Sequence, residues 1–209
     1  MRYDRFAAII LAAGFSSRMG QFKPLLPVGE KTVIEHTIGF FKKSDIGSIV
    51  VVTGHRASEI SRVIRSSGAR VVKNHEYERG MFSSVKTGIR NLNAEKTDAF
   101  FIIPADICLV RPLTIRLLAA AFEKKFGKII HPCFGSKRGH PPLITASLIP
   151  VILKSETDYG LNTILQKYEH LAVDIHVPDR NILINMNSPR DYEDVLSRYQ
   201  NQDIPSVGE

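Results

Sequence analysis

Short, uninterrupted apolar runs alternate with amphipathic stretches along most of this chain. Three runs rich in Ala, Val, Ile and Phe predict strands that are buried on both faces, namely Ala7–Leu11, Ser48–Thr53 and Ala99–Ile103. Shorter strands are predicted at Arg70–Lys73, Lys128–Cys133, Leu143–Thr145, Ala172–Val177 and Ile182–Asn185. Because a run without polar alternation offers no face to water, the pattern indicates a mostly parallel sheet that is covered on both sides.

Apolar residues at helical spacing predict the elements between these strands. Helices are expected over Ala57–Ser66, Met81–Leu92 and Pro112–Phe126. A last helix is expected to begin at Ser188-Pro189, since serine suits the N-cap and proline the first helical position. The alternation predicts an α/β fold with an open, Rossmann-like, mostly parallel sheet and helices on both faces.

The loop after the first strand is the most informative part of the sequence. The run Leu11-Ala12-Ala13-Gly14 leads into a polar turn with Arg18 and Lys23. Small residues let backbone amides approach an anion, and an arginine and a lysine match a polyphosphate. The loop also follows the carboxyl end of a strand, where open α/β sheets bind ligands. We therefore predict a phosphate-binding loop, although it has neither the G-x-G-x-x-G nor the Walker A spelling.

Asp106 is the second candidate residue. It follows the predicted strand Ala99–Ile103 and is therefore expected at the same edge of the sheet as the loop. Mg²⁺ bound to phosphates takes one or two carboxylates from a protein, which fits this position. An aspartate that only stabilises the turn before Pro112 is the alternative.

Composition limits the classes of function. The chain has 209 residues, 44% of them hydrophobic and 23% charged, which predicts one domain over residues 1–200 and a disordered tail over 201–209. The net charge of +7 suits an anionic substrate such as a nucleoside triphosphate. Lys and Arg never form a run longer than two, so we expect no nucleic-acid partner. No apolar run is long enough to span a membrane, so no membrane association is expected.

Cys108 and Cys133 lie in separate apolar segments without C-x-x-C spacing. This placement predicts neither a disulfide nor a zinc site, and it favours a reducing cytoplasm. The apolar run near the N-terminus leads directly into the phosphate-binding loop and is interpreted as a core strand rather than a signal peptide.

The spelling L-A-A-G-x-S-x-R-M-G-x-x-K, from Leu11 to Lys23, resembles the signature of the nucleotidyltransferases. Within that superfamily it is most similar to the molybdenum cofactor cytidylyltransferases, with the guanylyltransferases of the same cofactor as near relatives. The resemblance implies the nucleotide-diphospho-sugar transferase type of fold. It also implies transfer of CMP from CTP to the phosphate of molybdopterin, with release of pyrophosphate and Mg²⁺ as cofactor. A molybdoenzyme or its maturation chaperone is the implied protein partner.

The resemblance also implies roles for individual residues. The segment Ile103–Asp106 resembles the metal-binding segment of the family, so that Asp106 would hold Mg²⁺ and act in catalysis with Arg18 and Lys23. The segment Gly80–Val85 resembles the G-M-x-x-S-[LV] segment that meets the base and ribose. N-capping by its serines is the alternative. The implied nucleotide-binding residues are Leu11, Ala12, Ala13, Gly14, Arg18, Lys23, Gly80 and Ser84.

Two further segments match with differences. The segment Lys137–Pro142 resembles R-R-G-[NH]-P and implies that Arg138 and His140 contact the acceptor, while His140 equally suits a turn or the core. Asn187 stands where cytidylyltransferase relatives carry the last Asp of D-x-D-T-P. It would be an uncharged second ligand of Mg²⁺, or would only precede the helix.

The choice of base and acceptor leaves alternatives open. Ala13 resembles the CTP-using branch, since GTP-using relatives place glycine there, whereas Asn185 and Asn187 resemble the guanylyltransferases. The alternatives are therefore a guanylyltransferase on the same cofactor, or a cytidylyl or uridylyl transferase that acts on a sugar or alcohol phosphate. A non-catalytic nucleotide-binding protein is the alternative from another class.

Overall fold

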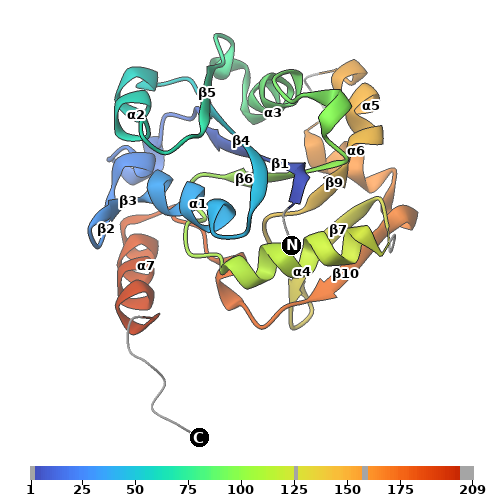
Figure 1. Ribbon diagram of the computed structural model, residues 1–209. Helices are drawn as coiled ribbons and strands as arrows, with labels where there is room; N and C mark the ends of the chain where they lie inside the picture. Colours follow the sequence, from blue (N-terminus) through green and yellow to red (C-terminus); the bar gives the residue numbers. More distant parts are fainter. Residues whose placement is uncertain (1–2, 125–126, 157–159, 203–209) are drawn as a thin grey trace, which may run out of the picture.

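A mixed, mostly parallel β-sheet forms the centre of the computed structural model, which describes residues 3–124, 127–156 and 160–202 except for the side chains of Arg18 and Gln202. Within these ranges the sheet has eight strands in the order β10-β7-β9-β6-β1-β4-β5, with β8 paired to β7 (Figure 1). The strands are β1 (Tyr3–Ala12), β4 (Ile46–Thr53), β5 (Arg70–Lys73), β6 (Ala99–Pro104), β7 (Ile129–Phe134), β8 (Lys137–Arg138), β9 (Leu143–Thr145) and β10 (Ala172–His176). A separate hairpin consists of β2 (Pro27–Val28) and β3 (Lys31–Thr32).

Strand β1 lies between β4 and β6 and is parallel to both, with Ile10 opposite Val51 and Ile103. Strands β4 and β5, and likewise β7 and β10, also pair in parallel. Strand β9 is antiparallel to both β6 and β7 and joins the two parallel parts. The mostly parallel sheet predicted from the apolar runs is thus confirmed.

Helices cover both faces of the sheet (Figure 1). They are α1 (Val33–Lys42), α2 (Ala57–Val63), α3 (Met81–Arg90), α4 (Pro112–Glu123), α5 (Ile149–Lys154), α6 (Leu161–Gln166) and α7 (Pro189–Gln202). Buried residues of α1, α2 and α4 pack on one face, and those of α3, α5 and α6 pack on the other. Every helix in the described ranges is too short or too polar to cross a lipid bilayer.

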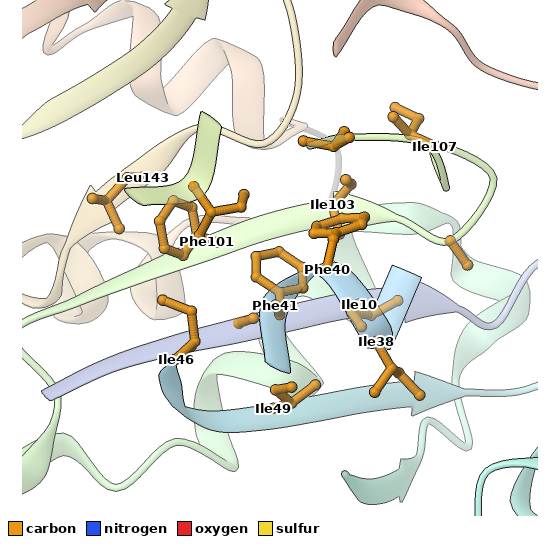
Figure 2. Packing of buried hydrophobic residues seen from close by; sticks show 14 of the residues in the cluster. Ile10, Ile38, Phe40, Phe41, Ile46, Ile49, Phe101, Ile103, Ile107 and Leu143 are labelled. Carbon is orange, nitrogen blue, oxygen red and sulfur yellow. The ribbon is translucent and has the colours of Figure 1, made fainter. Parts of the chain in front are cut away.

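Side chains alternate along β1, so the strand contributes residues to the hydrophobic cores on both faces of the sheet. Ile10 points into the core beneath α1, where Phe41 and Phe101 contact each other with ring centroids 5.6 Å apart (Figure 2). Ile9 points into the opposite core, which lies beneath α3. At Gly88 of α3 an added Cβ would lie 2.4 Å from Cγ2 of Ile9, so only glycine permits this approach of helix and strand.

Two predicted elements differ from the structure. The predicted strand Ile182–Asn185 is wrong, because Arg180–Leu183 forms a 3-10 helix. The side chain of Asp179 begins that helix by accepting from the Asn181 amide at 3.1 Å, and it also accepts from Thr114 Oγ1 at 2.7 Å. These side-chain hydrogen bonds of Asp179 stabilise a turn, which competes with pairing of the segment in a sheet.

The boundaries of the predicted helices also shift. The helix predicted over Ala57–Ser66 ends at Val63, and the one predicted over Met81–Leu92 ends at Arg90. The helix predicted over Pro112–Phe126 ends at Glu123, and residues 125–126 lie outside the described residues. The last helix begins at Pro189 as predicted and continues through Gln202, so the first two residues of the predicted disordered tail are helical. Residues 203–209 lie outside the described residues.

Candidate active site

Three side chains that are far apart in the sequence meet at the carboxyl edge of β1 and β6. The Lys23 ammonium lies 2.9 Å from Oδ2 of Asp106 and 3.2 Å from Oδ1 of Asn187. The Lys23 side chain is 11% exposed and that of Asp106 18% exposed, so this ion pair is largely shielded from water. Its position places a charged cluster beside the loop that the sequence predicts to bind phosphate.

Backbone hydrogen bonds hold the segments of this cluster together. The Ala105 amide donates to the Leu11 carbonyl at 3.0 Å, which joins the end of β6 to the end of β1. The Met186 amide donates to the Asp106 carbonyl at 3.3 Å, which joins the segment before α7 to the turn after β6. The three segments therefore meet through main-chain contacts as well as through the side chains of the cluster.

A small apolar core lies beside the charged cluster. It comprises Met19, Leu26, Val28, Val33, Cys108, Leu109, Met186 and Val195. These residues come from the loop after β1, the hairpin, α1, the segment after β6, and α7 with the segment that leads into it. Each of the three charged or polar side chains thus has a close sequence neighbour in this core, which we call the α7 core. Its packing fixes the distances between the three segments.

The start of the phosphate-binding loop presents backbone to solvent. The side chains of Leu11, Ala12 and Ala13 are buried, whereas Gly14 is exposed. An added Cβ at Gly14 would meet nothing within 4 Å, and its backbone lies outside the left-handed region. Neither packing nor conformation among the described residues therefore requires glycine here. The amides of Gly14 and Phe15 donate no hydrogen bond to any described residue, so both are available to an anion.

A strained residue connects the loop to Lys23. Ser16 adopts a left-handed conformation with φ of 58°, which costs a residue other than glycine about 1–2 kcal/mol. Its Oγ accepts a hydrogen bond from the Lys23 amide at 3.2 Å. This bond closes the loop so that the lysine returns to the edge of the sheet. The side chain of Arg18 lies outside the described residues, so its predicted catalytic and nucleotide-binding roles stay predictions.

Aromatic rings connect the loops after β1, β4 and β5. The half-exposed ring of Phe15 lies 5.2 Å from both the His55 and the Tyr77 rings, measured between centroids. His55 also donates its backbone amide to the Ala13 carbonyl at 3.1 Å. These contacts hold the phosphate-binding loop against its two neighbouring loops.

The segment predicted to meet the base lies at the start of α3. Gly80 is exposed, with φ of 95°, and precedes the first residue of the helix. Ser84 is buried, and its hydroxyl accepts from Asn74 Nδ2 at 3.0 Å, as does that of Ser83 at 2.8 Å. Ser83 donates to the Gly80 carbonyl at 2.8 Å rather than accepting from a backbone amide of the helix. The alternative of N-capping by these serines is therefore wrong, since the N-cap is Gly80 and no side chain caps the helix.

The two residues predicted to contact the acceptor have different partners in the structure. The Arg138 guanidinium forms ion pairs with Glu169 and Asp174, both at 2.6 Å. The side-chain hydrogen bond to Glu169 raises the pKa of Arg138. Both partners are acidic side chains of the chain itself, and the predicted contact of Arg138 with the acceptor stays a prediction.

His140 lies toward the charged cluster. Burial lowers the pKa of His140, while the Asp106 carboxylate and a hydrogen bond with the Ile102 backbone partly offset this effect. Its Nδ1 is buried and has no hydrogen-bond partner among the described residues. The structure thus brings His140 within reach of the Asp106 charge, and its predicted contact with the acceptor stays a prediction.

Two polar residues of the site were missed in the sequence. Asn74 binds both serines of α3, and no motif in its segment indicates that role. Asp191 accepts from the Asn187 and Ser188 amides at 2.9 and 2.8 Å. The spacing of Ser188 and Asp191 is that of a capping box, a signal that could have found the aspartate. Because Asp191 orients the Asn187 backbone, it helps to place the Asn187 side chain beside Lys23.

The chemistry of the cluster suits a hard cation. Asp106 and Asn187 present one carboxylate and one amide oxygen toward a single point, which the Lys23 ammonium occupies. Mg²⁺ prefers oxygen ligands and often takes only one or two carboxylates, with water and phosphate completing its shell. Among the described residues, no three His, Cys, Asp or Glu side chains gather into a preformed metal site. The donors fit a cation that arrives with its own phosphate ligands.

Cys108 lies close to this cluster but cannot serve as a nucleophile at neutral pH. Burial raises the pKa of its thiol to about 12, with a smaller contribution from the Asp106 charge. Only the thiolate is a strong nucleophile, so Cys108 acts as a small apolar residue of the α7 core.

Comparison with known families matches residues 8–172 to the MobA-like NTP transferase domain. The chain belongs to this family. It is 27% identical over 195 residues to the molybdenum cofactor cytidylyltransferase of Escherichia coli strain K12, with 91% of this chain and 95% of that protein covered. This membership confirms the resemblance found in the Leu11–Lys23 loop, which lies within the matched residues.

Other relatives show the breadth of the family. The chain is 26% identical over 166 residues to the nicotine blue oxidoreductase of Paenarthrobacter nicotinovorans, with 76% of this chain and 80% of that protein covered. A solved nucleotidyl transferase from Methanothermobacter thermautotroptrophicus superposes with a TM-score of 0.80 at 23% identity, with 95% of this chain and 99% of that one covered. This structural likeness confirms the nucleotide-diphospho-sugar transferase type of fold.

Proposed function

We propose that this protein is a Mg²⁺-dependent cytidylyltransferase that transfers CMP from CTP to the phosphate of molybdopterin and releases pyrophosphate. The observation that carries the proposal is the meeting of Lys23, Asp106 and Asn187 beside an open phosphate-binding loop. The family and the relative from Escherichia coli support it.

The loop has the features needed to hold a triphosphate. The free amides of Gly14 and Phe15 would donate to phosphate oxygens, and the open space at Gly14 allows a close approach. Lys23 is on the same loop and would neutralise the charge that develops on the departing pyrophosphate. Positioning and charge stabilisation thus supply most of the rate enhancement, as in other phosphoryl-type transfers.

Asp106 and Asn187 are the residues that would hold Mg²⁺. When bound, the ion would neutralise phosphate charge as a Lewis acid. The protein supplies no general base in this proposal, because a phosphate monoester acceptor is already ionised near neutral pH. His140, which lies within reach of the Asp106 charge and stays neutral at pH 7, would help to bind the acceptor.

The choice of CTP rests on the region between the loop and α3. Ala13 stands where the GTP-using relatives would have glycine, which favours the smaller pyrimidine base. Gly80 and the Asn74–Ser84 pair lie at the start of α3, where exposed amides would meet the polar edge of cytosine. A guanylyltransferase on the same cofactor and a transferase for sugar or alcohol phosphates remain the alternatives.

A pyrophosphate-release assay with CTP, GTP, UTP or ATP, each with and without molybdopterin, tests the proposal. We expect release only with CTP, and only when molybdopterin and Mg²⁺ are present. Release with GTP would favour the guanylyltransferase, and release with a sugar phosphate would move the acceptor to that class. Binding of CTP without release under any condition would contradict transferase activity.

One relative makes a separate control necessary. Because a relative matched over 80% of its length is named as an oxidoreductase, sequence similarity alone does not determine the reaction. The same protein preparation is therefore also incubated with NADH or NADPH and an electron-accepting dye, with molybdopterin absent. Nicotinamide oxidation without pyrophosphate release would overturn the proposal.

The cellular setting is part of the same proposal. We place the protein in a reducing cytoplasm, where it would pass the modified cofactor to a molybdoenzyme or its maturation chaperone. Cys108 and Cys133 are both free thiols, which is compatible with that compartment.

A further inference from the structure

The Lys23 ammonium stands at the point where two oxygen donors converge. It lies 2.9 Å from the Asp106 carboxylate and 3.2 Å from the Asn187 amide oxygen. The lysine is one of few buried charged residues, and its side chain is only 11% exposed. Such a lysine is held by its partners rather than by water.

We infer that Lys23 and a divalent cation compete for the same pair of oxygens, so that the metal is bound tightly only after a triphosphate draws Lys23 away. This inference rests on the proposed function, in which Asp106 and Asn187 hold Mg²⁺. It adds an order of events, in which the lysine keeps the metal site closed until nucleotide arrives.

Distances make simultaneous occupation unfavourable. Mg²⁺ requires oxygen ligands at about 2.0–2.1 Å. These distances are shorter than the 2.9 and 3.2 Å that now separate the two oxygens from the ammonium. An ammonium that remained within 3.2 Å of both oxygens would lie against the metal ion. Two positive charges at such a separation repel strongly in a shielded site. One of them must therefore leave the oxygen pair.

The other groups near Asp106 do not replace Lys23 as its counter-charge. His140 is held neutral at pH 7, because burial lowers its pKa. Burial keeps the Cys108 thiol protonated, with a pKa of about 12. Asp191 is itself acidic and adds no positive charge. Its carboxylate accepts from the Ser188 hydroxyl and from the Asn187 amide. Within the described part of the chain, Lys23 is the cation paired with Asp106.

The phosphate-binding loop gives the lysine a second destination. Lys23 belongs to the same loop as Gly14 and Phe15, whose amides donate no hydrogen bond to a described residue and are available to an anion. A triphosphate bound there would offer negative oxygens to the ammonium and would bring oxygen ligands for the metal. Nucleotide binding would thus open the oxygen pair and complete the metal shell in one event.

The experiment measures Mn²⁺ binding in the absence of nucleotide and acceptor. Electron paramagnetic resonance reports free Mn²⁺ directly, so no turnover is needed. We expect Lys23→Met, which keeps the volume but removes the charge, to bind Mn²⁺ at least about 10-fold more tightly than the unmodified protein. Lys23→Arg should not show this gain, because it retains a cation beside Asp106.

Controls separate competition from a change in folding. Lys31→Met alters an exposed lysine of β3 and should leave Mn²⁺ affinity unchanged. The double variant Lys23→Met with Asp106→Asn should lose the gain. Circular dichroism and urea unfolding verify that each variant is folded before the titration.

Two results would overturn the inference. One is a Lys23→Met protein that is folded and binds Mn²⁺ no more tightly than the unmodified protein. The other is tight nucleotide-free binding of Mn²⁺ to the unmodified protein that CTP does not strengthen. Failure of the proposed transferase activity is a separate outcome, because it would be seen in the pyrophosphate assay and not in this titration.

Discussion

At the scale of single residues, the ion pair of Lys23 and Asp106 concentrates the chemistry of the molecule. Both side chains are largely buried. Each position could be found in the sequence, since Lys23 is in the polar loop after the first apolar strand and Asp106 follows another apolar strand. Their approach could be predicted, because carboxyl ends of parallel strands meet at one edge of a sheet. The ion pairs of Arg138 with Glu169 and Asp174 could not be predicted, because those partners lie in another part of the chain.

Removing either member of the ion pair should depress turnover. We expect Lys23→Ala and Asp106→Ala each to lower kcat for pyrophosphate release by at least about 10²-fold, because charge stabilisation is the main contribution to catalysis in this proposal. Steady-state assays measure the effect, with Lys31→Ala as the exposed control. Unchanged rates in the two site variants would reject their catalytic assignment.

The partly buried His140 should make stability depend on pH between neutrality and mild acid. Burial lowers its pKa in the folded protein, whereas the unfolded chain titrates near about 6.5. As pH falls through that value, the unfolded state takes up the proton first, so the free energy of unfolding decreases. The loss is complete once pH lies below the folded pKa.

Urea unfolding at pH 7.5 and 5.5 measures this dependence. His140→Gln should reduce the difference in unfolding free energy between the two pH values. His75→Gln, at an exposed position, is the control and should preserve it. If both variants show the same pH dependence as the unmodified protein, His140 is not the group responsible.

At the scale of elements, caps and close approaches decide where helices lie. Helix α1 went unpredicted although Thr32 and Glu35 form a capping box, a signal that is readable from the sequence. The predicted strand Ile182–Asn185 failed because apolar spacing alone cannot tell a short strand from a turn that Asp179 caps. Local pattern thus identified most strands, but it missed α1 and misassigned the segment that Asp179 caps.

Asp191 should stabilise the start of α7 and the position of Asn187. Its carboxylate accepts from both the Asn187 and Ser188 amides, so Asp191→Asn should cost about 1 kcal/mol of unfolding free energy, the usual value of a helix cap. Urea unfolding at pH 7 measures it, with the exposed Glu193→Gln as the control.

The effect of Asp191 should fade in acid. The Ser188 hydroxyl, followed by the Asn187 and Ser188 amides, lowers the pKa of Asp191. Its contribution to stability is therefore present above the unfolded pKa of about 3.9 and is lost as pH falls through the folded value. An Asp191→Asn protein as stable as the unmodified one at pH 7 would contradict the capping role.

Two helical glycines offer a matched comparison. Gly88→Ala places a Cβ 2.4 Å from Ile9 and should destabilise the protein by about 1–3 kcal/mol through overpacking. An added Cβ at Gly39 of α1 meets nothing within 4 Å, so Gly39→Ala should stabilise by about 0.5–1 kcal/mol. Thermal and urea unfolding measure both. Equal effects of the two substitutions would contradict the close approach of α3 to β1.

At the scale of the whole molecule, the α7 core links the site to the fold. It joins residues near Lys23, Asp106 and Asn187, whereas the cores on the two sheet faces carry the bulk of the packing. Loss of packing in the α7 core should therefore affect the site more than an equal loss elsewhere.

Met186 and Ile152 test this relation, since both are fully buried but lie in different cores. Met186→Ala and Ile152→Ala should each cost about 2–5 kcal/mol of unfolding free energy. At a temperature where circular dichroism shows both to be folded, we expect kcat to fall for Met186→Ala and to stay near the unmodified value for Ile152→Ala. A similar decrease in kcat for both would mean that stability alone controls activity.

The sequence by itself determined the long apolar strands, the loop after β1 that we predict to bind phosphate, and the order in which Lys23 and Asp106 follow their strands, because these depend on local pattern. The antiparallel insertion of β9, the ion pairs of Arg138 and the place of the Lys23 ammonium between Asp106 and Asn187 were decided only by the tertiary structure. The physical reason is that these features depend on which segments meet in space. The free energy of such contacts belongs to pairs of residues up to 164 positions apart.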